Sequence, residues 1–414
     1  MFRLPFLFIV TGIISFTLFQ LYSLGDFASW LTTLGDTPRY STGWFRVHLL
    51  VLGWGTMIAM GAVYQLIPVV LQNHNLFSRK LGFVHYGFFA VGTAGLLIGF
   101  QTITIPVIAA FATLAFIGIL LFAFNIGMTL YRAKKWNTVT LSTALAVGYL
   151  VLTGLSGMLM GLNFYFQQWG NFHDQLLGAH IWFGAFGWFG MLITGFSYKM
   201  YPMFYLSHGH PEKLQKVVIG LWNIGVLTGA FSFLFGAPLW LKWCGFVLIA
   251  AALTVYTVHL AQMVKHRHKN EPGAGMKWAQ TLSGAISLIA IIVVLLLPFF
   301  PGIAQEPRLL VIMGWIYIFG WIGLTILSYL SKIVPFLWWT HKYGPVVGKQ
   351  KTPVMSQMIS DRYVHIAISC IVGSLFLMLL GLGWSLPYLT SIGGSLLALC
   401  SLIYAGMIAL VFTK

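Results

Sequence analysis

The stretch WFRVHLLVLGWGTMIAMGAVYQLIPVVL, residues 44–71, carries the pattern from which the architecture follows. It is long and apolar, and its Gly-Trp pair and its proline both return twice along the chain. The pair stands at Gly53-Trp54, Gly187-Trp188 and Gly320-Trp321, and the proline at Pro68, Pro202 and Pro335. The proline follows its Gly-Trp pair by the same interval in all three places. A repeat this long predicts one structural unit that is used three times.

The composition of the chain is that of a membrane protein. Charged residues make up 7% of its 414 residues and hydrophobic ones 59%, and its mean hydropathy is +0.87. A soluble domain of this size would lack the polar surface that it needs to face water. A span needs about 20 apolar residues. We therefore expect an all-α polytopic protein with about twelve transmembrane helices, at 4–24, 44–71, 82–100, 103–131, 139–162, 177–205, 214–236, 239–263, 276–299, 308–338, 361–383 and 388–413.

Twelve spans over three units give four helices to each unit. We expect a single membrane domain, 1–414, built from three pseudo-symmetric four-helix repeats at approximately 1–138, 139–272 and 273–414. The repeated proline stands inside the second helix of each unit, where it would release a backbone carbonyl and bend the helix.

The distribution of basic residues predicts the orientation in the membrane. With the N-terminus inside, only four of the 23 Lys and Arg fall on the outer side, namely Arg39, Arg46, Lys242 and Arg308. This asymmetry follows the positive-inside rule, so we expect both termini on the cytoplasmic side of a bacterial-type inner membrane. The net charge of +16 is then a signal of topology. It gives no reason to expect a nucleic-acid partner, and membrane lipids are the expected neighbours.

Histidines inside the apolar spans are the first candidates for chemistry, because coordinating side chains are costly in hydrocarbon. His48 and His180 each lie near the outer end of the second helix of a unit. His173 precedes His180 by seven residues, which places both on one face if the helix extends that far. A neutral imidazole is a common ligand of haem iron and copper. For any one embedded histidine, a hydrogen-bonded structural role is an equal alternative.

Other polar residues are weaker candidates. His85, His259 and His365 lie near the cytoplasmic ends of their helices and are secondary candidates for ligands. The loop pair His208-Gly-His210 could take a metal ion, although its spacing alone is a weak signal. Lys199 and Lys332 stand in register, one repeat apart, where a role in a transport pathway competes with simple snorkelling to the interface.

A threefold chain with histidines near the outer ends of helices two and six resembles subunit I of the haem-copper oxidases. The resemblance is closest to the cbb-type branch and to the NnrS-type membrane proteins. Arg46-Val-His48, followed by Tyr64, is similar to the helix that carries the low-spin haem ligand. Gly178-Ala-His180, followed by Tyr198, is similar to the helix that carries the first copper ligand. The resemblance implies haem of b type as the cofactor, with copper as a further candidate.

The repeat also shows which ligands of that family are missing. Helix ten of the family carries His-x-His, but His48 and His180 project forward onto Trp315 and Met313 in this chain. The adjacent histidine pair expected in helix seven is absent as well, since 214–236 holds no histidine. A standard proton-pumping terminal oxidase cannot be built from these residues. His48 and His180 also differ by two residues in register, which turns a helix by roughly 200°.

We therefore expect a haem-binding membrane protein that binds, senses or turns over a diatomic gas, nitric oxide or oxygen. His48 would hold the haem, with Met313 as a candidate ligand on the other side, and His180 and His173 would hold a second haem or a copper ion. The alternative is a transporter, or a metal- or haem-delivery protein, that kept the fold without a binuclear centre. A third reading is a structural subunit. The sequence does not decide whether the chain is an enzyme, and it identifies neither a redox partner nor an oligomeric state.

Overall fold

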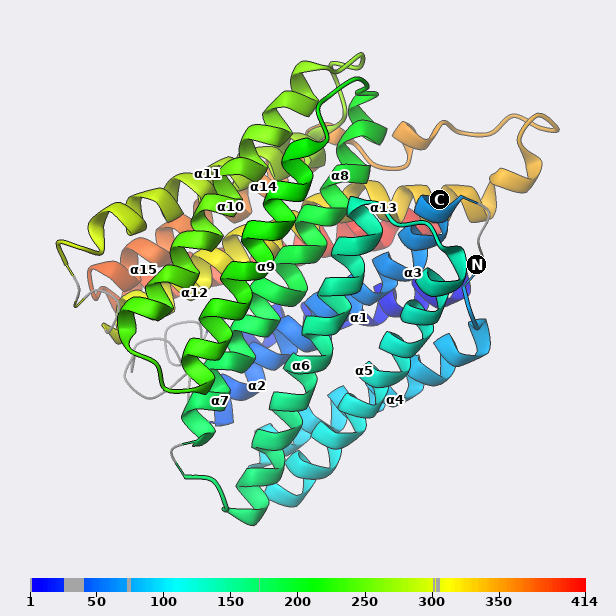
Figure 1. The fold of residues 1–414 in the computed structure, drawn as a ribbon. Helices are drawn as coiled ribbons and strands as arrows, with labels where there is room; N and C mark the ends of the chain where they lie inside the picture. The colour runs from blue at the N-terminus through cyan, green and yellow to red at the C-terminus, as the bar shows by residue number, and fades with distance from the viewer. Residues whose placement is uncertain (1, 26–40, 73–75, 171, 301, 303–305) are drawn as a thin grey trace. The chain divides into compact units, whose positions relative to one another are not determined.

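The computed structural model describes residues 2–25, 41–72, 76–170, 172–300, 302 and 306–414 (Figure 1). Arg39, used above for the topology, lies outside this part of the chain. In the described residues, twelve helices are long and apolar enough to cross a membrane. They are Arg3–Ser23, Ser41–Leu71, Arg79–Thr102, Ile105–Ala133, Thr138–Phe166, Phe172–Tyr205, Lys213–Leu234, Leu239–Lys265, Ala274–Leu296, Pro307–Lys342, Asp361–Gly383 and Pro387–Thr413. The prediction of an all-α, twelve-span membrane protein is confirmed.

Nine of these spans are single or nearly single α-helices, and three are divided into segments. The undivided helices are α1 (Arg3–Ser23), α4 (Arg79–Thr102), α5 (Ile105–Ala133), α6 (Thr138–Phe166), α9 (Lys213–Leu234), α10 (Leu239–Lys265), α11 (Ala274–Leu296), α14 (Asp361–Gly383) and α15 (Pro387–Ala409), which the short η8 (Leu410–Thr413) continues. Two short 3-10 turns, η6 (Gly344–Val346) and η7 (Met355–Gln357), lie in the loop before α14.

Several helices begin before the apolar stretch that predicted them, because polar residues cap their first turns. The side chain of Asn137 accepts a hydrogen bond from the amide of Thr140, whose hydroxyl accepts one from the amide of Asn137. Ser78 Oγ accepts from the amide of Leu81 at 3.1 Å and starts α4 three residues earlier than expected. Side chains of this kind satisfy amides that the helix itself leaves unpaired. A prediction from hydropathy alone does not detect these capping residues.

The second helix of each predicted repeat contains a π-helical segment. The segments are η2 (Leu49–Thr56), between α2 (Ser41–His48) and α3 (Met57–Leu71); η3 (Trp182–Gly190), between α7 (Phe172–Ile181) and α8 (Met191–Tyr205); and η5 (Trp315–Gly323), between α12 (Pro307–Gly314) and α13 (Leu324–Lys342). Their first residues are evenly spaced along the chain, and each segment contains one Gly-Trp pair. Wide π turns are rare and occur frequently at functional sites.

The chain divides into two compact units. One consists of 1–62, 271–283 and 299–414, and the other of 63–270 and 284–298. The first is filled by large buried side chains such as Phe8, Phe16 and Trp321, and the second by Trp188 and Trp222. These units do not coincide with the predicted repeats, and the threefold division stays a prediction.

Small residues let neighbouring helices approach closely within each unit. In the second unit, α4 packs on α5 and α9 on α10, as Figure 1 shows. A methyl group on Gly92 would collide with the backbone of Ala115, and one on Gly245 would meet the backbone of Gly229. In the first unit, α14 packs on α15, and a methyl group on Gly393 would collide with α14. Contacts of this type replace the hydrophobic effect as the packing force between helices in lipid.

Candidate functional site

His48 is the last residue of α2 and lies directly before the π-helical segment η2. Its Nδ1 lies 2.8 Å from the carbonyl oxygen of Trp44, four residues earlier. Since a carbonyl can only accept, Nδ1 carries the proton and donates it, and the lone pair of the ring is on Nε2. A metal-ligating histidine usually donates its other N–H in this way, which fixes the tautomer and the orientation of the ring.

A buried cation accompanies His48 on the same helix. Arg46 is 2% exposed, and its guanidinium carbon lies 5.0 Å from the centre of the Tyr22 ring. Such cation–π contact stabilises an arginine that has lost part of its hydration. The sequence analysis used Arg46 as an outer-side charge and as part of the phrase Arg46-Val-His48, and gave it no role at the site. The signal for a closer role was its place within an apolar span, two residues before His48.

His180 lies near the end of α7, just before η3, and its ring is held by α6. Its Nδ1 is 2.9 Å from the carbonyl oxygen of Thr153 and 3.2 Å from the hydroxyl of Ser156. The ring fits because residue 157 is glycine: a Cβ atom there would lie 3.1 Å from His180 Cε1. His180 therefore also donates from Nδ1 and has its lone pair on Nε2, as His48 does.

The structure does not bring His173 and His180 to a common point. The Nδ1 atom of His173 lies 3.2 Å from the side-chain amide of Asn163, and its ring packs against Phe164. Asn163 and Thr153 are ten residues apart on α6, which corresponds to about 15 Å of helix. The two imidazoles are anchored separately, so joint ligation of one copper ion by His173 and His180 would require one anchor to break.

Met313 and Trp315 are the residues onto which the repeat interval projects His180 and His48. Met313 lies in the last full turn of α12 and is half-buried, and Trp315 opens η5 and is 7% exposed. Counted from the first π-helical residue, His48 stands one position before it, while His180 and Met313 each stand two positions before it. The register difference between His48 and His180 is thus one residue by this count, or about 100° of rotation.

The three secondary candidates have different surroundings. His85, in α4, is fully buried and its Nδ1 lies 3.0 Å from the hydroxyl of Tyr64. His259, in α10, is fully buried beside Tyr198 and near Gln215. His365 is exposed at the start of α14, and its Nδ1 accepts a hydrogen bond from the indole of Trp278 at 3.1 Å. His85 has a structural partner, and exposure makes His365 a poor place for an embedded cofactor.

Of the two lysines considered for a transport pathway, Lys199 and Lys332, the structure gives an ion pair for Lys332. Lys332 Nζ lies 3.0 Å from Asp361 Oδ1, and the same carboxylate oxygen accepts from the amide of Ala274 at 3.1 Å. Lys332 therefore joins α13 to the starts of α14 and α11. This arrangement supports a structural role for Lys332 over that of a mobile pathway charge.

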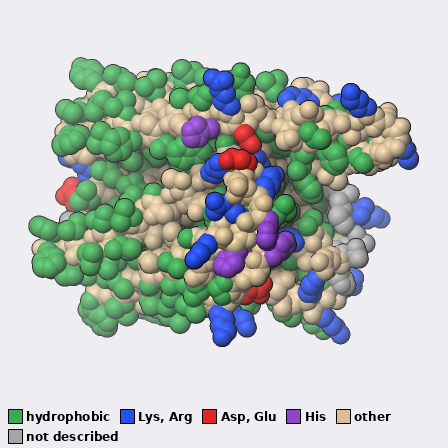
Figure 2. Space-filling view, turned by 90° about the horizontal axis from the view of Figure 1, so that it is seen from above, with side chains coloured by type: hydrophobic (Ala, Val, Ile, Leu, Met, Phe, Trp, Pro, Cys, Tyr) green, Lys and Arg blue, Asp and Glu red, His purple; other side chains and the backbone are tan. Residues whose placement is uncertain are grey.

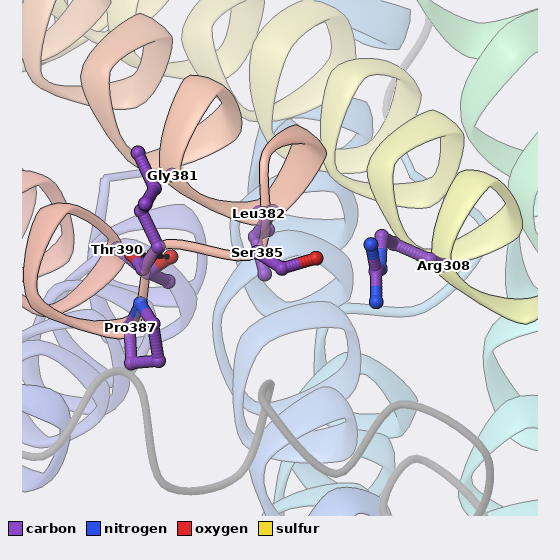
Figure 3. Close-up of a pocket in the computed structure, with 7 residues that line it drawn as sticks. Arg308, Gly381, Leu382, Ser385, Pro387 and Thr390 are labelled. Carbon is purple, nitrogen blue, oxygen red and sulfur yellow. Dashed lines mark hydrogen bonds between the residues drawn. The ribbon is translucent and has the colours of Figure 1, made fainter.

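A small pocket lies at one end of the first unit, between α12, α14 and α15. Figure 3 shows the side chain of Arg308 from α12 facing Ser385 and the start of α15 at Pro387. The pocket encloses about 60 Å³. That volume holds about two water molecules, so this pocket suits water or a small ion and not a macrocycle.

In the described residues, no three side chains from His, Cys, Asp and Glu are arranged to hold one metal ion. A copper centre with three imidazole ligands therefore has no counterpart in this part of the chain. Copper at His173 and His180 stays a prediction.

The family model described as cytochrome C and quinol oxidase polypeptide I matches residues 1–243, more than half of the chain. The matched range contains His48, His173 and His180 together with η2 and η3, and it ends before Met313. A search of curated proteins found no match to the chain.

Proposed function

The chain belongs to the family of cytochrome c and quinol oxidase polypeptide I, and we propose that it is a haem-binding membrane protein whose iron binds a diatomic gas, nitric oxide or oxygen. The observation that carries the proposal is the hydrogen bond from His48 Nδ1 to the carbonyl of Trp44, 2.8 Å long. It fixes the tautomer that haem iron requires, with Nε2 as the ligand atom. A bound haem would supply an iron atom that accepts a small gas ligand at its sixth position.

The donor set around His48 fits a haem in charge as well as in ligand type. A haem carries two propionate groups, and an anion in a membrane needs a nearby cation. Arg46, buried two residues before His48, supplies a guanidinium on the same side of the span. Planar guanidinium groups bind carboxylates with two parallel hydrogen bonds. We assign His48 to ligation and Arg46 to propionate binding.

The absence of a second imidazole from the His48 register leaves the sixth position open. Trp315, onto which the interval between the Gly-Trp pairs projects His48, has no lone pair that could ligate iron. Met313 offers a thioether sulfur, a weak and displaceable ligand by comparison with imidazole. Both readings allow a gas to bind, directly or by displacing the sulfur. A haem between two imidazoles would serve electron transfer instead.

His180 supports a second cofactor position. Its Nδ1–H is shared between Thr153 and Ser156, and Gly157 leaves room for the ring. We propose that His180 Nε2 ligates a second haem or a copper ion. His173, anchored on Asn163, belongs to a separate position unless that anchor breaks.

The basic residues support a membrane orientation with both termini in the cytoplasm of a bacterial-type cell. Lys265, Arg267 and Lys269 follow α10, and on that side the loops are rich in positive charge. Reporter fusions at residue 414 and after α10 at residue 269 test the orientation. An outward C-terminus would contradict it.

Visible absorption of the purified full-length protein tests the proposed function. We expect a Soret band, and a shift of that band when carbon monoxide or nitric oxide is added to the reduced protein. His48→Ala should remove most of the band, while His341→Ala, at an exposed histidine stacked on Phe2, should leave it unchanged. Wild-type protein that contains neither haem nor iron contradicts the proposal. Metal uptake by such a protein would favour the delivery or transport alternative.

A further inference from the structure

Two loops of the second unit and the end of α10 bring five histidines together. The loop 206–212 follows α8, and the loop 266–270 follows α10. The amides of His268 and Lys269 both donate to the carbonyl oxygen of Tyr205, at 3.2 and 3.0 Å. The hydroxyl of Ser207 donates to the carbonyl oxygen of Met263 at 2.6 Å. These hydrogen bonds hold each loop against the end of the other helix. The histidine cluster is defined as His208, His210, His259, His266 and His268.

The histidine cluster contains two ring pairs. The rings of His210 and His259 are 5.6 Å apart at 74°, and those of His208 and His268 are 6.0 Å apart at 32°. Figure 2, which views the molecule from the end where α8 stops, shows purple histidine side chains beside blue Lys and Arg side chains and a red acidic one. Each pair joins the loop after α8 to α10 or to the loop after α10, so the sequence alone does not reveal the pairs.

The pair His210–His259 has two buried ring nitrogens without a hydrogen-bond partner. They are the Nδ1 atoms of both residues. Gln262 follows His259 by one turn of α10 and lies close enough to interact with its ring, but its Oε1 forms no hydrogen bond. The other nitrogen of His259, Nε2, lies 3.3 Å from Gln215 Nε2, within hydrogen-bond reach. A buried polar atom without a partner is costly, and each one in a native structure calls for an explanation.

At the corresponding position of the first repeat, the side chain has its hydrogen-bond partners. The interval from Gly53 to Gly187 also separates Asn125 from His259 and Tyr64 from Tyr198. Asn125 accepts a hydrogen bond from the amide of Ser78 at 3.1 Å and donates to the carbonyl of Ser78 at 2.9 Å. The same position is therefore saturated in one repeat by an amide. In the other it carries an imidazole with an unpaired nitrogen.

We propose that His210 and His259 bind a first-row transition-metal ion through their Nδ1 atoms. Imidazole is a preferred ligand of Zn²⁺, Cu²⁺ and Ni²⁺. Ligation would satisfy both unpaired nitrogens at once. In the described residues no third His, Cys, Asp or Glu stands in place, so water or the exposed rings of His208 and His266 complete the coordination. A site of this kind is open and exchangeable, unlike a closed structural site.

The electrostatic setting keeps His210 in the form that a metal needs. Burial lowers the pKa of His210; the carboxylate of Glu212 opposes this shift, while His266 and His208 add to the lowering. Only the neutral ring has a lone pair for the ion. Glu212 also contributes the negative charge that offsets the surrounding lysines.

Isothermal titration of Zn²⁺ into the purified full-length protein tests the proposal. We expect wild type to bind Zn²⁺, and binding to weaken by about tenfold or more in His210→Ala and in His259→Asn. His259→Asn introduces the residue that the first repeat carries at this position, and His210→Ala changes a loop. The two variants alter different elements, so a folding defect in one leaves the other as the test. His341→Ala is the control and should bind as wild type does. Haem content, read from the absorption spectrum, should not change in any of these variants.

Two outcomes would overturn the proposal. Wild type that binds no Zn²⁺ leaves the two nitrogens to a bridging water molecule. Variants that bind Zn²⁺ as tightly as wild type place the ion elsewhere, on the loops or on the embedded histidines. Because the haem spectrum is recorded in the same samples, a failure of this site is distinguishable from a failure of the proposed function.

Discussion

The spans Phe172–Tyr205 and Pro307–Lys342 share one succession of helical segments and carry different side chains. Both run from an α-helix through a π-helical segment, η3 or η5, into a second α-helix with a buried helix interior and an internal proline. The first carries His180 two residues before the π segment, and the second carries Met313 there. The π segment thus occurs with a histidine two residues before it and also with a methionine there. It belongs to the fold and does not depend on a histidine at this position.

The largest effect is expected from His48, the one imidazole that the proposal cannot replace. His48→Ala removes the Nε2 ligand, and we expect the haem content per protein to fall to about a tenth or less. Haem absorption relative to protein concentration measures the loss. Exogenous imidazole should restore part of the Soret band, because the ligand site is left empty and not collapsed. A variant with full haem content would assign the haem to another residue.

The second-largest effect is expected from adding a ligand to the span Pro307–Lys342, so that it resembles the span Ser41–Leu71. Trp315→His places an imidazole at the position onto which the interval between the Gly-Trp pairs projects His48. If the iron lies between these positions, both axial sites become occupied. We expect haem content to stay near that of wild type while the carbon monoxide difference spectrum is lost. Met313→Ala is the matched variant, and it should leave the carbon monoxide spectrum in place or strengthen it.

Unchanged carbon monoxide binding by a folded Trp315→His protein would mean that the repeat phase does not place residue 315 opposite His48. The haem would then have to be held from another side. That result would leave His48 as a ligand and remove Met313 from the site.

Helices were predictable here because hydropathy depends only on local composition, and twelve spans follow from it. The π-helical segments were not predictable, because a pair such as Gly53-Trp54 is as compatible with close helix packing as with a π turn. His48 and His180 stood out as polar residues in apolar runs, but their tautomers depend on carbonyls at Trp44 and Thr153. The pair His210–His259 joins a loop to a helix that comes much later in the sequence. Such a contact exists only once the chain has folded.

A third, intermediate effect concerns the Gly-Trp pairs themselves. A Cβ atom on Gly187 would lie 2.6 Å from the side chain of Tyr149, whereas one on Gly320 would lie 3.4 Å from Leu375. Gly187→Ala therefore overpacks η3, and we expect it to destabilise the protein by about 1–3 kcal/mol. Gly320→Ala should be neutral or stabilising by up to about 1 kcal/mol, because alanine favours a helix over glycine. Thermal unfolding in detergent measures both.

Equal destabilisation by the two glycine variants would show that η3 and η5 are packed alike in the membrane. The comparison of the two spans would then lose its structural basis, although their different ligands would remain.

The smallest effect is expected at the second anchor of His180. Ser156→Ala removes a hydroxyl 3.2 Å from Nδ1 but leaves the carbonyl of Thr153 at 2.9 Å to accept the proton. The ring keeps its tautomer, so affinity for the second cofactor should weaken by about 1 kcal/mol or less, which is at most about fivefold. Gly157→Val, in contrast, crowds Cε1 and should displace the ring. Cofactor titration of the two variants, with the His48 haem as an internal reference, separates a positioning role of α6 from simple packing. A loss in Ser156→Ala as large as in Gly157→Val would mean that the hydroxyl, and not the carbonyl, sets the orientation of His180.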